Sequence, residues 1–400
     1  MREGWQITKL GAISEIFRGG SPRPIKSFIT QEADGVNWIK IGDTEVGGKY
    51  IYSTEEKIRR EGMRSSRYVE PGDFLLSNSM SFGRPYILKT DGCIHDGWLV
   101  IKKYDRTLIQ DFLYYLLLSP VVARQFEEGA RGSTVRNLNT DIVSNVVVSY
   151  PVSHIEQQRI VNILDREFAK IDALKANAEK SLQAAKDLYA EMLDTSLSSQ
   201  NGWKTKTLDE VCSKITDGTH HSPPNTPSGE YKYITAKNIK PWGLDLTDLT
   251  FVSKDIHKEI YSRCNPNKGD VLYIKDGATT GIAIVNPLEE EFSLLSSVAL
   301  LKPIPAEITS HYLCYAMNSP RMYAFVRERM DGAAITRITL KKIKAFPVSY
   351  PAIDEQNAIV SRLDDLKDRC NTLQQNYQKT LTLCDDLKQS LLRKAFNGEL

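Results

Sequence analysis

The sequence lacks several features that would assign it to common protein classes. Its longest apolar run, Phe112–Leu118, is too short to span a bilayer, and the opening MREGWQITKL contains no apolar export signal. The six cysteines include no CxxC pair, which argues against a disulfide framework or a zinc knuckle. The 52 basic and 50 acidic residues nearly balance, so any attraction to nucleic acid must be local. These absences favour a soluble, cytoplasmic protein.

Motifs for nucleotide binding and DNA chemistry are also missing. GDTEVGGKY resembles a phosphate-binding loop, but its glycine spacing is one residue too long. Ser222–Asn225 reads SPPN, without the acidic or amide residue and the aromatic ring with which adenine methyltransferases hold a flipped base. Glu55-x-Lys57 resembles a nuclease triplet that is common in charged chains, and His220-His221 has no second ligand cluster. We expect no catalytic residue, metal or cofactor; an enzyme and a DNA-free scaffold stay as alternatives.

The sequence does contain a tandem duplication. A shift of about 198 positions aligns Gly4-Trp5 with Gly202-Trp203 and Ser119-Pro120 with Ser319-Pro320. Each copy begins with about 150 residues of short β-like runs, turn signals and short helical patterns. These stretches, residues 1–153 and 201–352, are predicted to be two similar mixed α/β domains in an α+β fold.

Each copy ends in a long helical pattern without proline, predicted to cover residues 154–200 and 353–400. Apolar residues recur every seven positions, and such a stripe needs a second helix to cover it. The nearest partner is the other copy, so the sequence predicts an antiparallel coiled coil and a pseudo-twofold internal repeat. The predicted contact positions are Leu164, Ile171, Leu174, Ala178, Ala185, Leu188 and Met192 in the first helix, and Leu363, Leu366, Cys370, Leu373, Tyr377, Cys384, Leu387 and Leu391 in the second.

Four motifs occur in a fixed order: the Gly-Trp-x4-Leu openings, the segments PGDFLLSNSMSFG and KGDVLYIKDGATTG, a Tyr-Pro followed by EQQRIVNILD, and the ending LLRKAFNGEL. Together they resemble the specificity subunits of type I restriction-modification systems, over nearly the whole chain. The resemblance implies two target recognition domains that each bind half of a bipartite double-stranded DNA target, with the helices setting the spacing. It also implies two methyltransferase subunits carrying S-adenosylmethionine, and restriction subunits carrying ATP and magnesium, as partners of a non-catalytic chain.

Polar loops with glycine are the candidates for base contact, because they can enter a groove and present side chains to base edges. Many glycine loops are plain turns, but these recur at matching places in both copies. The basic stretches 57–67 and 254–268 are candidates for phosphate contact, with a solvated helix face as the alternative. The predicted DNA-binding residues are Arg18, Ser21, Arg23, Ser77, Asn78, Ser79, Ser81, Arg84, Ser133, Thr134, Arg136 and Asn137 in the first copy, and Thr219, His220, His221, Lys237, Asn238, Lys275, Thr279, Thr280, Thr336 and Arg337 in the second.

Overall fold

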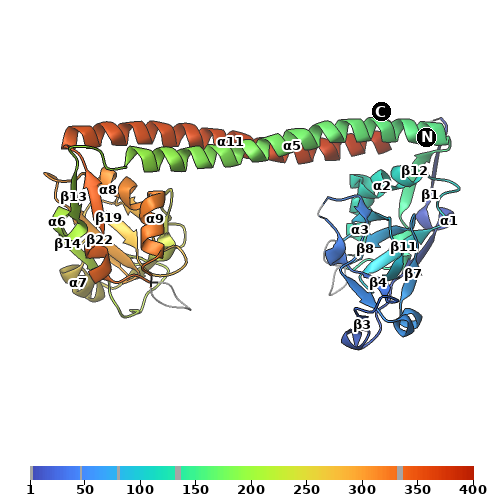
Figure 1. Ribbon diagram of the computed structural model, residues 1–400, viewed down its shortest axis with the longest axis horizontal. Helices are drawn as coiled ribbons and strands as arrows, with labels where there is room; N and C mark the ends of the chain where they lie inside the picture. Colours follow the sequence, from blue (N-terminus) through green and yellow to red (C-terminus); the bar gives the residue numbers. More distant parts are fainter. Residues whose placement is uncertain (1–2, 46, 79–81, 131–136, 331–336) are drawn as a thin grey trace. The chain divides into compact units, whose positions relative to one another are not determined.

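The structure is a computed structural model that describes residues 3–45, 47–78, 82–130, 137–330 and 337–400. The chain divides into two compact units (Figure 1). Unit 1 contains Met1–Ala178 and Lys379–Leu400, and unit 2 contains Glu179–Gln378. Each unit therefore holds one globular domain and a segment of each long helix, with residues from both halves of the duplicated sequence.

The globular domain of unit 1 has two five-stranded sheets, with the orders β2-β11-β8-β9-β5 and β3-β6-β4-β10-β7. A two-stranded sheet pairs β1 with β12. The elements in chain order are β1 (Trp5–Lys9), α1 (Leu10–Ile13), β2 (Glu15–Arg18), η1 (Ile25–Ser27), β3 (Ile29–Thr30), β4 (Val36–Ile39), η2 (Ile41–Asp43), β5 (Tyr50–Ile51), β6 (Glu56–Ile58), η3 (Arg60–Ser65), β7 (Arg67–Val69), β8 (Phe74–Ser77), β9 (Pro85–Leu88), β10 (Gly92–Ile94), β11 (Trp98–Lys102), α2 (Gln110–Leu118), α3 (Pro120–Gly129), α4 (Thr140–Ser144), β12 (Val147–Pro151) and α5 (His154–Ser196).

The globular domain of unit 2 has a four-stranded sheet, β14-β22-β19-β20, and a three-stranded sheet, β18-β15-β21. Two further strand pairs are β13-β23 and β16-β17. The elements are β13 (Lys204–Thr207), α6 (Leu208–Val211), β14 (Cys212–Asp217), β15 (Tyr231–Ile234), η4 (Ala236–Asn238), β16 (Ile239–Lys240), β17 (Gly243–Leu244), β18 (Thr250–Val252), α7 (Lys254–Arg263), β19 (Val271–Ile274), β20 (Ala283–Val285), β21 (Phe292–Leu294), β22 (Val298–Pro303), α8 (Ser310–Met317), α9 (Pro320–Arg327), α10 (Leu340–Lys344), β23 (Pro347–Tyr350) and α11 (Ile353–Phe396).

The central strands of unit 1 are buried because their sequences are continuously apolar. Strand β8 reads FLLS and is fully buried, and β11 reads WLVIK and is buried up to its last residue. Side chains of these strands share one core with α2, with the start of α5 and with Leu392, Ala395 and Phe396 near the end of α11. The C-terminal residues of the chain thus complete the core of unit 1.

The core of unit 2 is completed in the same way by the end of α5. Leu193 is buried in one cluster with Val271 and Tyr273 of β19, and Tyr189 and Leu197 pack against that cluster. Leu193 and Leu392 occupy corresponding places in the two copies, about 200 positions apart. Each globular domain therefore uses a helix end from the other copy of the repeat. Within the described residues, no helix combines the length and apolarity needed to cross a membrane.

A glycine turn precedes the central strand of each unit. Gly72 and Gly269 have positive φ values of 99° and 89°, which other residues rarely adopt. The aspartates that follow them, Asp73 and Asp270, each accept a hydrogen bond from the backbone N–H three residues earlier, at 2.9 and 2.7 Å. The repeated Gly-Asp pair in the sequence thus reflects one turn used twice.

A buried glutamine fixes the start of each long helix to its own globular domain. Gln157 is fully buried; its Oε1 accepts from the Ile109 N–H, and its amide donates to the carbonyls of Thr107 and Pro151, all at 2.9 Å. Gln356 makes the same three bonds, also at 2.9 Å, to backbone groups about 200 positions further along the chain. The repeated Glu-Gln pair at each helix start therefore contains an anchor.

A tyrosine contact reinforces this joint in both units. The Tyr115 hydroxyl donates to Asp165 of α5, and the Tyr315 hydroxyl donates to Asp364 of α11. Burial, together with the adjacent carboxylate, raises the pKa of both tyrosines above the ordinary value. Both hydroxyls therefore stay protonated donors at neutral pH, and each helix start is held at two points.

The two long helices run antiparallel in each unit, as predicted. In unit 1, Asp172 pairs with Lys388, and Lys175 pairs with Asp385 at 2.8 Å. Later residues of α5 thus meet earlier residues of α11. In unit 2, the end of α5 shares a core with the start of α11.

One predicted lane of helix contacts is buried, and the other is not. Three members of the first lane are exceptions, because Tyr377 and Leu391 are only partly buried and Met192 is 42% exposed. Leu366 of the second lane is partly buried. The buried lane consists of Leu164, Ile171, Ala178, Ala185, Leu363, Cys370 and Cys384.

The second predicted lane lies on the outer side of the helix pair. Leu174, Leu188, Leu373 and Leu387, here called the outer leucines, are between 42% and 51% exposed. Beside a stripe of residues spaced by seven, a second row of contact residues can lie three or four positions after each stripe residue. In the structure the partly buried neighbours of the stripe, such as Tyr189, lie four positions after a stripe residue. The predicted lane lay three positions after the stripe, which is one residue too early.

Candidate nucleic-acid interface

Main-chain hydrogen bonds hold three loops of unit 1 together. The Gly20 N–H donates to the Ile94 carbonyl at 3.1 Å, and the Asn78 N–H donates to the Gly97 carbonyl at 2.9 Å. The Leu138 N–H in turn donates to the Asn78 carbonyl at 2.9 Å. These bonds bring the segments after β2, after β8 and before α4 to the turn between β10 and β11. We call this arrangement the loop frame.

Unit 2 contains the same loop frame. The Thr219 N–H donates to the Leu294 carbonyl at 2.8 Å, and the Lys275 N–H donates to the Ser297 carbonyl at 2.9 Å. The Ile338 N–H donates to the Lys275 carbonyl at 2.8 Å. All three bonds join positions that correspond to those in unit 1, so the frame belongs to the fold rather than to one set of side chains.

Backbones approach closely in both frames, which explains one repeated glycine. A Cβ atom on Gly19 would lie 2.2 Å from the carbonyl oxygen of His95. A Cβ atom on Gly218 would lie 1.8 Å from the carbonyl oxygen of Leu294. Only glycine fits at these corresponding positions.

The side chains on the two frames differ in charge. Arg18 pairs with Leu99 in the β2-β11 register, and Asp217 pairs with Ala299 at the corresponding place in the β14-β22 register. In the hydrogen-bond pattern of the second frame, Lys275 occupies the position that Asn78 occupies in the first. The same backbone therefore carries different side chains in each unit, and of these four only Arg18 is exposed.

Four predicted residues of unit 1 converge on Asp96, in the turn after β10. The Asp96 carboxylate accepts hydrogen bonds from the Ser21 hydroxyl at 2.8 Å and from Nη2 of Arg23 at 3.3 Å. Its carbonyl accepts from Nδ2 of Asn78 at 2.8 Å and from Nε of Arg18 at 3.4 Å. Burial alone would raise the pKa of Asp96, but the hydrogen bond from Ser21, a backbone bond and nearby cations bring the pKa below its usual value. Asp96 is therefore an ionised anchor for this cluster.

His95, next to this anchor, is held neutral. Its Nε2 faces the Ile41 N–H at 3.1 Å, and its Nδ1 faces the Gly97 N–H at 2.7 Å. Burial lowers the pKa of His95, because the charged ring would lose its hydration. A protonated ring would direct an N–H at both backbone N–H groups, whereas a neutral ring can accept from one of them. The Asp96 carboxylate, 3.7 Å from Nδ1, acts in the opposite direction, but the effect of burial is larger and the neutral form is favoured at pH 7.

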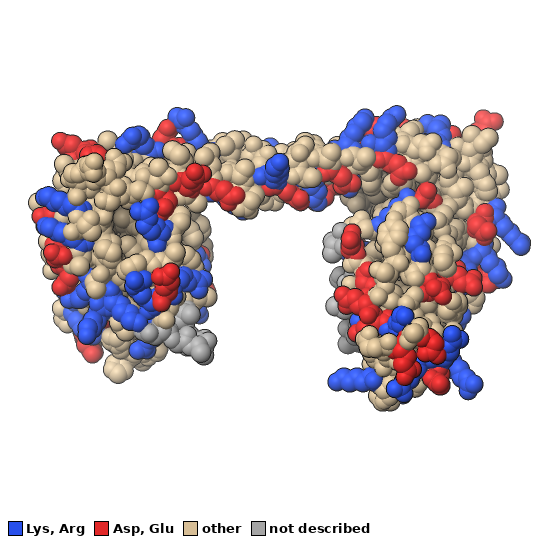
Figure 2. Space-filling view, in the orientation of Figure 1, with Lys and Arg blue, Asp and Glu red and all other residues tan. Residues whose placement is uncertain are grey.

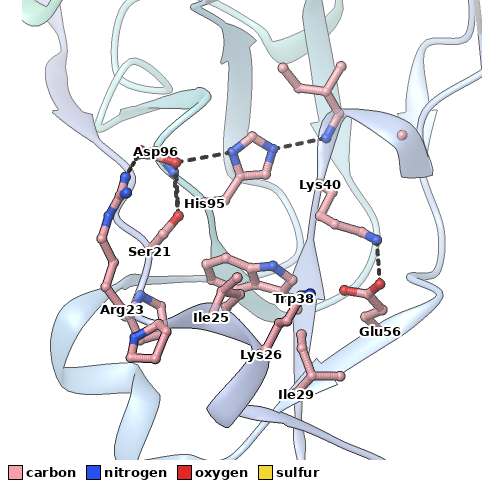
Figure 3. Close-up of a pocket in the computed structure, with 14 residues that line it drawn as sticks. Ser21, Arg23, Ile25, Lys26, Ile29, Trp38, Lys40, Glu56, His95 and Asp96 are labelled. Carbon is pink, nitrogen blue, oxygen red and sulfur yellow. Dashed lines mark hydrogen bonds and ion pairs between the residues drawn. The ribbon is translucent and has the colours of Figure 1, made fainter.

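A cavity of about 1100 Å³ opens beside the Asp96 cluster. Figure 3 shows that Ser21, Arg23 and Ile25 form one side of it. Across from this loop lie Trp38 and the ion pair between Lys40 and Glu56, whose closest N···O distance is 2.9 Å. The loop after β2 therefore forms a wall of the cavity and also supplies two ligands to Asp96. The remaining lining residues are Pro22, Pro24, Lys26, Ile29, Ile41, Gly42, His95 and Asp96.

In unit 2 the corresponding cluster is built around Asp217, which is buried at the end of β14. Nη2 of Arg263 donates to the Asp217 carboxylate at 2.7 Å and to the carbonyls of Asp217 and Gly218 at 3.1 and 2.5 Å. His220 and Lys275 approach the same carboxylate at 3.3 and 3.5 Å. The described residues contain no group of three or more His, Cys, Asp or Glu side chains placed to hold a metal ion.

Neither acidic anchor was among the residues predicted from the sequence. Asp96 and Asp217 are acidic residues among arginine- and glycine-bearing loops, and this is the only sequence signal that could have indicated them. Arg263 was a candidate only for phosphate contact, as part of a basic stretch. The structure adds these three residues to the candidate interface.

Several predicted DNA-binding residues are buried and bonded within the protein. Ser77 accepts from the Arg84 N–H at 3.0 Å, Asn238 accepts from the Thr235 N–H at 3.0 Å, and Thr280 donates to the Gly277 carbonyl at 2.7 Å. These bonds shape the loops, and DNA contact by these residues stays a prediction. The buried set is Ser77, Asn78, Asn238, Lys275 and Thr280.

The remaining predicted residues divide into three groups. Ser21 and Thr219 are partly buried, and Arg18, Arg23, Arg84, Asn137, His220, His221, Lys237, Thr279 and Arg337 are exposed. Ser79, Ser81, Ser133, Thr134, Arg136 and Thr336 lie outside the described residues.

Charged side chains are distributed differently over the visible faces of the two globular domains. Figure 2 shows acidic and basic residues interspersed on unit 1 and basic residues gathered on the part of unit 2 that holds α7. Helix α7 carries Lys254, Lys258 and Arg263. Each unit therefore has its own electrostatic surface.

Comparison with known proteins gives a consistent result over the whole chain. The family model "Type I restriction modification DNA specificity domain" matches residues 2–184 and again residues 200–383. The specificity subunit of the type I restriction enzyme EcoBI from Escherichia coli is 22% identical, and the match covers 100% of this chain and 87% of the relative. The EcoKI specificity subunit of Escherichia coli strain K12 is 19% identical, with 100% and 89% covered.

Two solved structures share the fold. One, from a study of complex assembly and conformational transition of the type I R-M system, has a TM-score of 0.82 at 20% identity, and covers 100% of this chain and 99% of its own. The HsdS subunit from Thermoanaerobacter tengcongensis has a TM-score of 0.60 at 20% identity, with 100% and 98% covered.

Proposed function

Because this chain belongs to the family of type I restriction-modification DNA specificity domains, we propose that each of its globular domains binds one half of a bipartite DNA target. The main support is the loop frame, which occurs in both units with different side chains. Two readers with different surfaces suit a target whose halves differ in sequence, and such a target need not be palindromic.

The chemistry of the complex belongs to other subunits in this proposal. The curated relatives are specificity subunits by name, and one fold neighbour comes from a study of how a type I system assembles. We assign this chain the reading of DNA, methylation to a partner that carries S-adenosylmethionine, and cleavage to a restriction partner that carries ATP and magnesium.

The outer leucines supply a docking surface for the methyltransferase. Leu174 and Leu387 lie on the helix pair of unit 1, and Leu188 and Leu373 lie on that of unit 2. The repeat relates Leu174 to Leu373 and Leu188 to Leu387, so the two surfaces have the same composition. Exposed apolar residues at equivalent places fit two copies of one partner.

The docking surface can be tested one unit at a time. The double variant Leu174→Gln with Leu387→Gln should bind one methyltransferase copy instead of two in native mass spectrometry. The matched variant Leu188→Gln with Leu373→Gln should lose the other copy. Binding of two copies by both variants would contradict this docking site.

The proposed function is tested by sequencing methylated sites in cells that express the chain with its methyltransferase. The expected result is one motif with two unlike halves and a fixed gap. If about 6 phosphates are neutralised, log K for the purified complex should fall with log salt at a slope of about −5. The rival scaffold role predicts no methylated motif and no affinity for DNA.

A further inference from the structure

Helix α9 places an arginine beside the loop frame of unit 2. A Cβ atom on Gly281, in the loop that begins at Lys275, would lie 2.9 Å from Cδ2 of Tyr323, so the tyrosine ring covers this turn. Arg327 follows one helical turn after Tyr323. Its Nε donates to the Tyr323 hydroxyl at 3.1 Å, and its Cζ lies 5.1 Å from the ring centroid. The ring therefore holds the guanidinium at the edge of the candidate interface.

The guanidinium of Arg327 keeps its charge and its outer pair of donors. Only Nε is engaged, and within the part of the chain that the structure describes Arg327 pairs with no carboxylate. Both Nη1 and Nη2 are left to donate, and they form the pair of N–H bonds at the end of the guanidinium. Two phosphate oxygens fit such a pair. The residue is exposed, so a ligand can reach it.

Further cations continue this surface. Arg329 lies against Phe325, with its Cζ 3.6 Å from the ring centroid, and its Nη1 donates to the Phe325 carbonyl at 3.0 Å. Nζ of Lys342 on α10 donates to the Arg329 carbonyl at 2.9 Å, which joins α10 to the end of α9. We call the three exposed cations of this region, Arg327, Arg329 and Lys341, the basic face.

The corresponding face of unit 1 is acidic. At a shift of 200 positions, Glu127 stands where unit 2 has Arg327, and Asp141 stands where unit 2 has Lys341. Both acidic residues are exposed. Arg124 is the only basic residue of α3 and α4. The fold therefore forms without the cations of the basic face, and a structural role does not explain them.

The charge of the basic face favours a phosphate over a base edge. Glu328 lies 3.4 Å from Arg329 and offsets part of its charge, but it does not pair with Arg327. The remaining positive charge attracts phosphates, whereas the edge of a base is neutral. The loop frame beside this face is the surface to which the proposed function assigns base contact. The phosphates nearest Arg327 are therefore those that flank the half-site.

We propose that the basic face binds the DNA backbone beside the half-site read by unit 2, with both Nη atoms of Arg327 on one phosphate. Tyr323 is a positioning residue that orients Arg327 for this contact. The acidic face of unit 1 makes no such contact, so the contact is confined to one side of the target. This inference rests on the proposed function and deepens it, because it names the surface that holds the backbone.

The test measures how the affinity of the full chain with its methyltransferase for DNA depends on salt. Arg327→Ala removes one phosphate contact, so the slope of log K against log salt should become less negative by about 0.9. Between about 50 and 200 mM salt, the affinity of the variant should fall about 3.5-fold less than that of the wild type. The selected motif should not change, because phosphates carry no sequence information.

Two variants separate the charge of Arg327 from its orientation. Arg327→Lys keeps the charge but loses the bidentate pair, so the slope should stay and the affinity for every sequence should fall about 2- to 10-fold. Tyr323→Phe keeps the ring and removes the hydroxyl that holds Nε. It should also lower affinity at an unchanged slope, while amides of β19 and β22 exchange as in the wild type. A merely structural tyrosine would change that exchange and not the affinity.

A matched control and a scan of the DNA locate the contact. Arg369 pairs with Asp365 at 2.7 Å on α11, outside the loop frame of unit 2. Arg369→Ala removes the same charge as Arg327→Ala and should leave the slope unchanged. Methylphosphonate linkages each remove the charge of one phosphate. One such linkage, on one side of the target, should weaken binding by the wild type and have no effect on Arg327→Ala.

The contrary results are distinct. An unchanged slope in Arg327→Ala would overturn the inference. A lost preference for one base would identify base contact, and loss of a methyltransferase copy in native mass spectrometry would identify an acidic protein surface as the ligand; either result overturns it as well. Because backbone contact does not depend on sequence, the slope is also measured on unrelated DNA. If the wild type selects no bipartite motif but this second slope still changes, the proposed function fails and the backbone contact stands.

Discussion

Replacement of Leu392 by alanine should destabilise unit 1, although this residue lies more than two hundred positions after Leu164, the last core residue from the first half of the chain. Leu392 is 1% exposed and packs in one cluster with Phe112, Ile160 and Leu164. Removal of three carbon atoms loses roughly 2.4 kcal/mol of transfer free energy, and the remaining cavity raises the cost to about 3–4 kcal/mol. Opening of unit 1 should become roughly 100- to 1000-fold more frequent.

Hydrogen exchange with mass spectrometry measures this effect strand by strand. In the Leu392→Ala variant, amides of β8 and β11 should exchange faster by that factor, and amides of β19 and β22 should not change. The matched variant is Leu193→Ala, which should accelerate β19 and β22 even though Leu193 lies on the helix that leaves unit 1. Faster exchange of β19 and β22 in Leu392→Ala, or unchanged exchange of β8 and β11, would refute the assignment of Leu392 to the core of unit 1.

Three further predictions follow from the joint, the histidine and the helices. Folding of unit 1 lowers the pKa of His95, so the unfolded chain binds a proton more readily than the folded chain does. The free energy of unfolding should therefore keep its full value above a pH of about 6.5 and decrease below it. His95→Asn should flatten that decrease in urea titrations at several pH values. Gln157→Ala removes three hydrogen bonds to backbone groups and should cost unit 1 about 1–3 kcal/mol, while Gln356→Ala removes the matching three and should cost unit 2 the same, as measured by hydrogen exchange in each unit. Insertion of one heptad in both α5 and α11 adds about 10 Å of helix, so the gap in the methylated motif should grow by about three base pairs; an unchanged gap would show that the helices do not set the spacing.

The sequence was informative where a local pattern has a single structural solution. The duplication, the two long helices and the buried lane at Leu164 and Ile171 follow from spacing alone, and the antiparallel pairing is confirmed. The lane at Leu174 was predicted wrongly because the second row of helix contacts can lie on either side of a heptad stripe. Which flank is buried depends on the partner helix and on large side chains such as Tyr189, and this information is not local.

The candidate interface was predictable at the level of loops but not of contacts. Glycine-bearing polar loops were the predicted segments, and the structure joins three segments at or beside them in each unit. The anchor role of Asp96 depends on a contact with Ser21 across 75 residues of sequence, and Asn78 turns inward to bond the same residue. Such long-range contacts are set by strand pairing, so one sequence without its fold cannot show which polar side chains face outward.

The loop frame is made of peptide groups, which every sequence supplies equally. Side chains on its rim can therefore be exchanged while the strands beneath them keep their pairing and register. The molecule already contains two such versions: Arg18 and Asn78 occupy two positions of the frame in unit 1, and Asp217 and Lys275 occupy the corresponding positions in unit 2. New recognition can thus arise by rewriting a few rim residues, and transplanting the rim of one unit onto the other should convert an asymmetric target into one with matching halves.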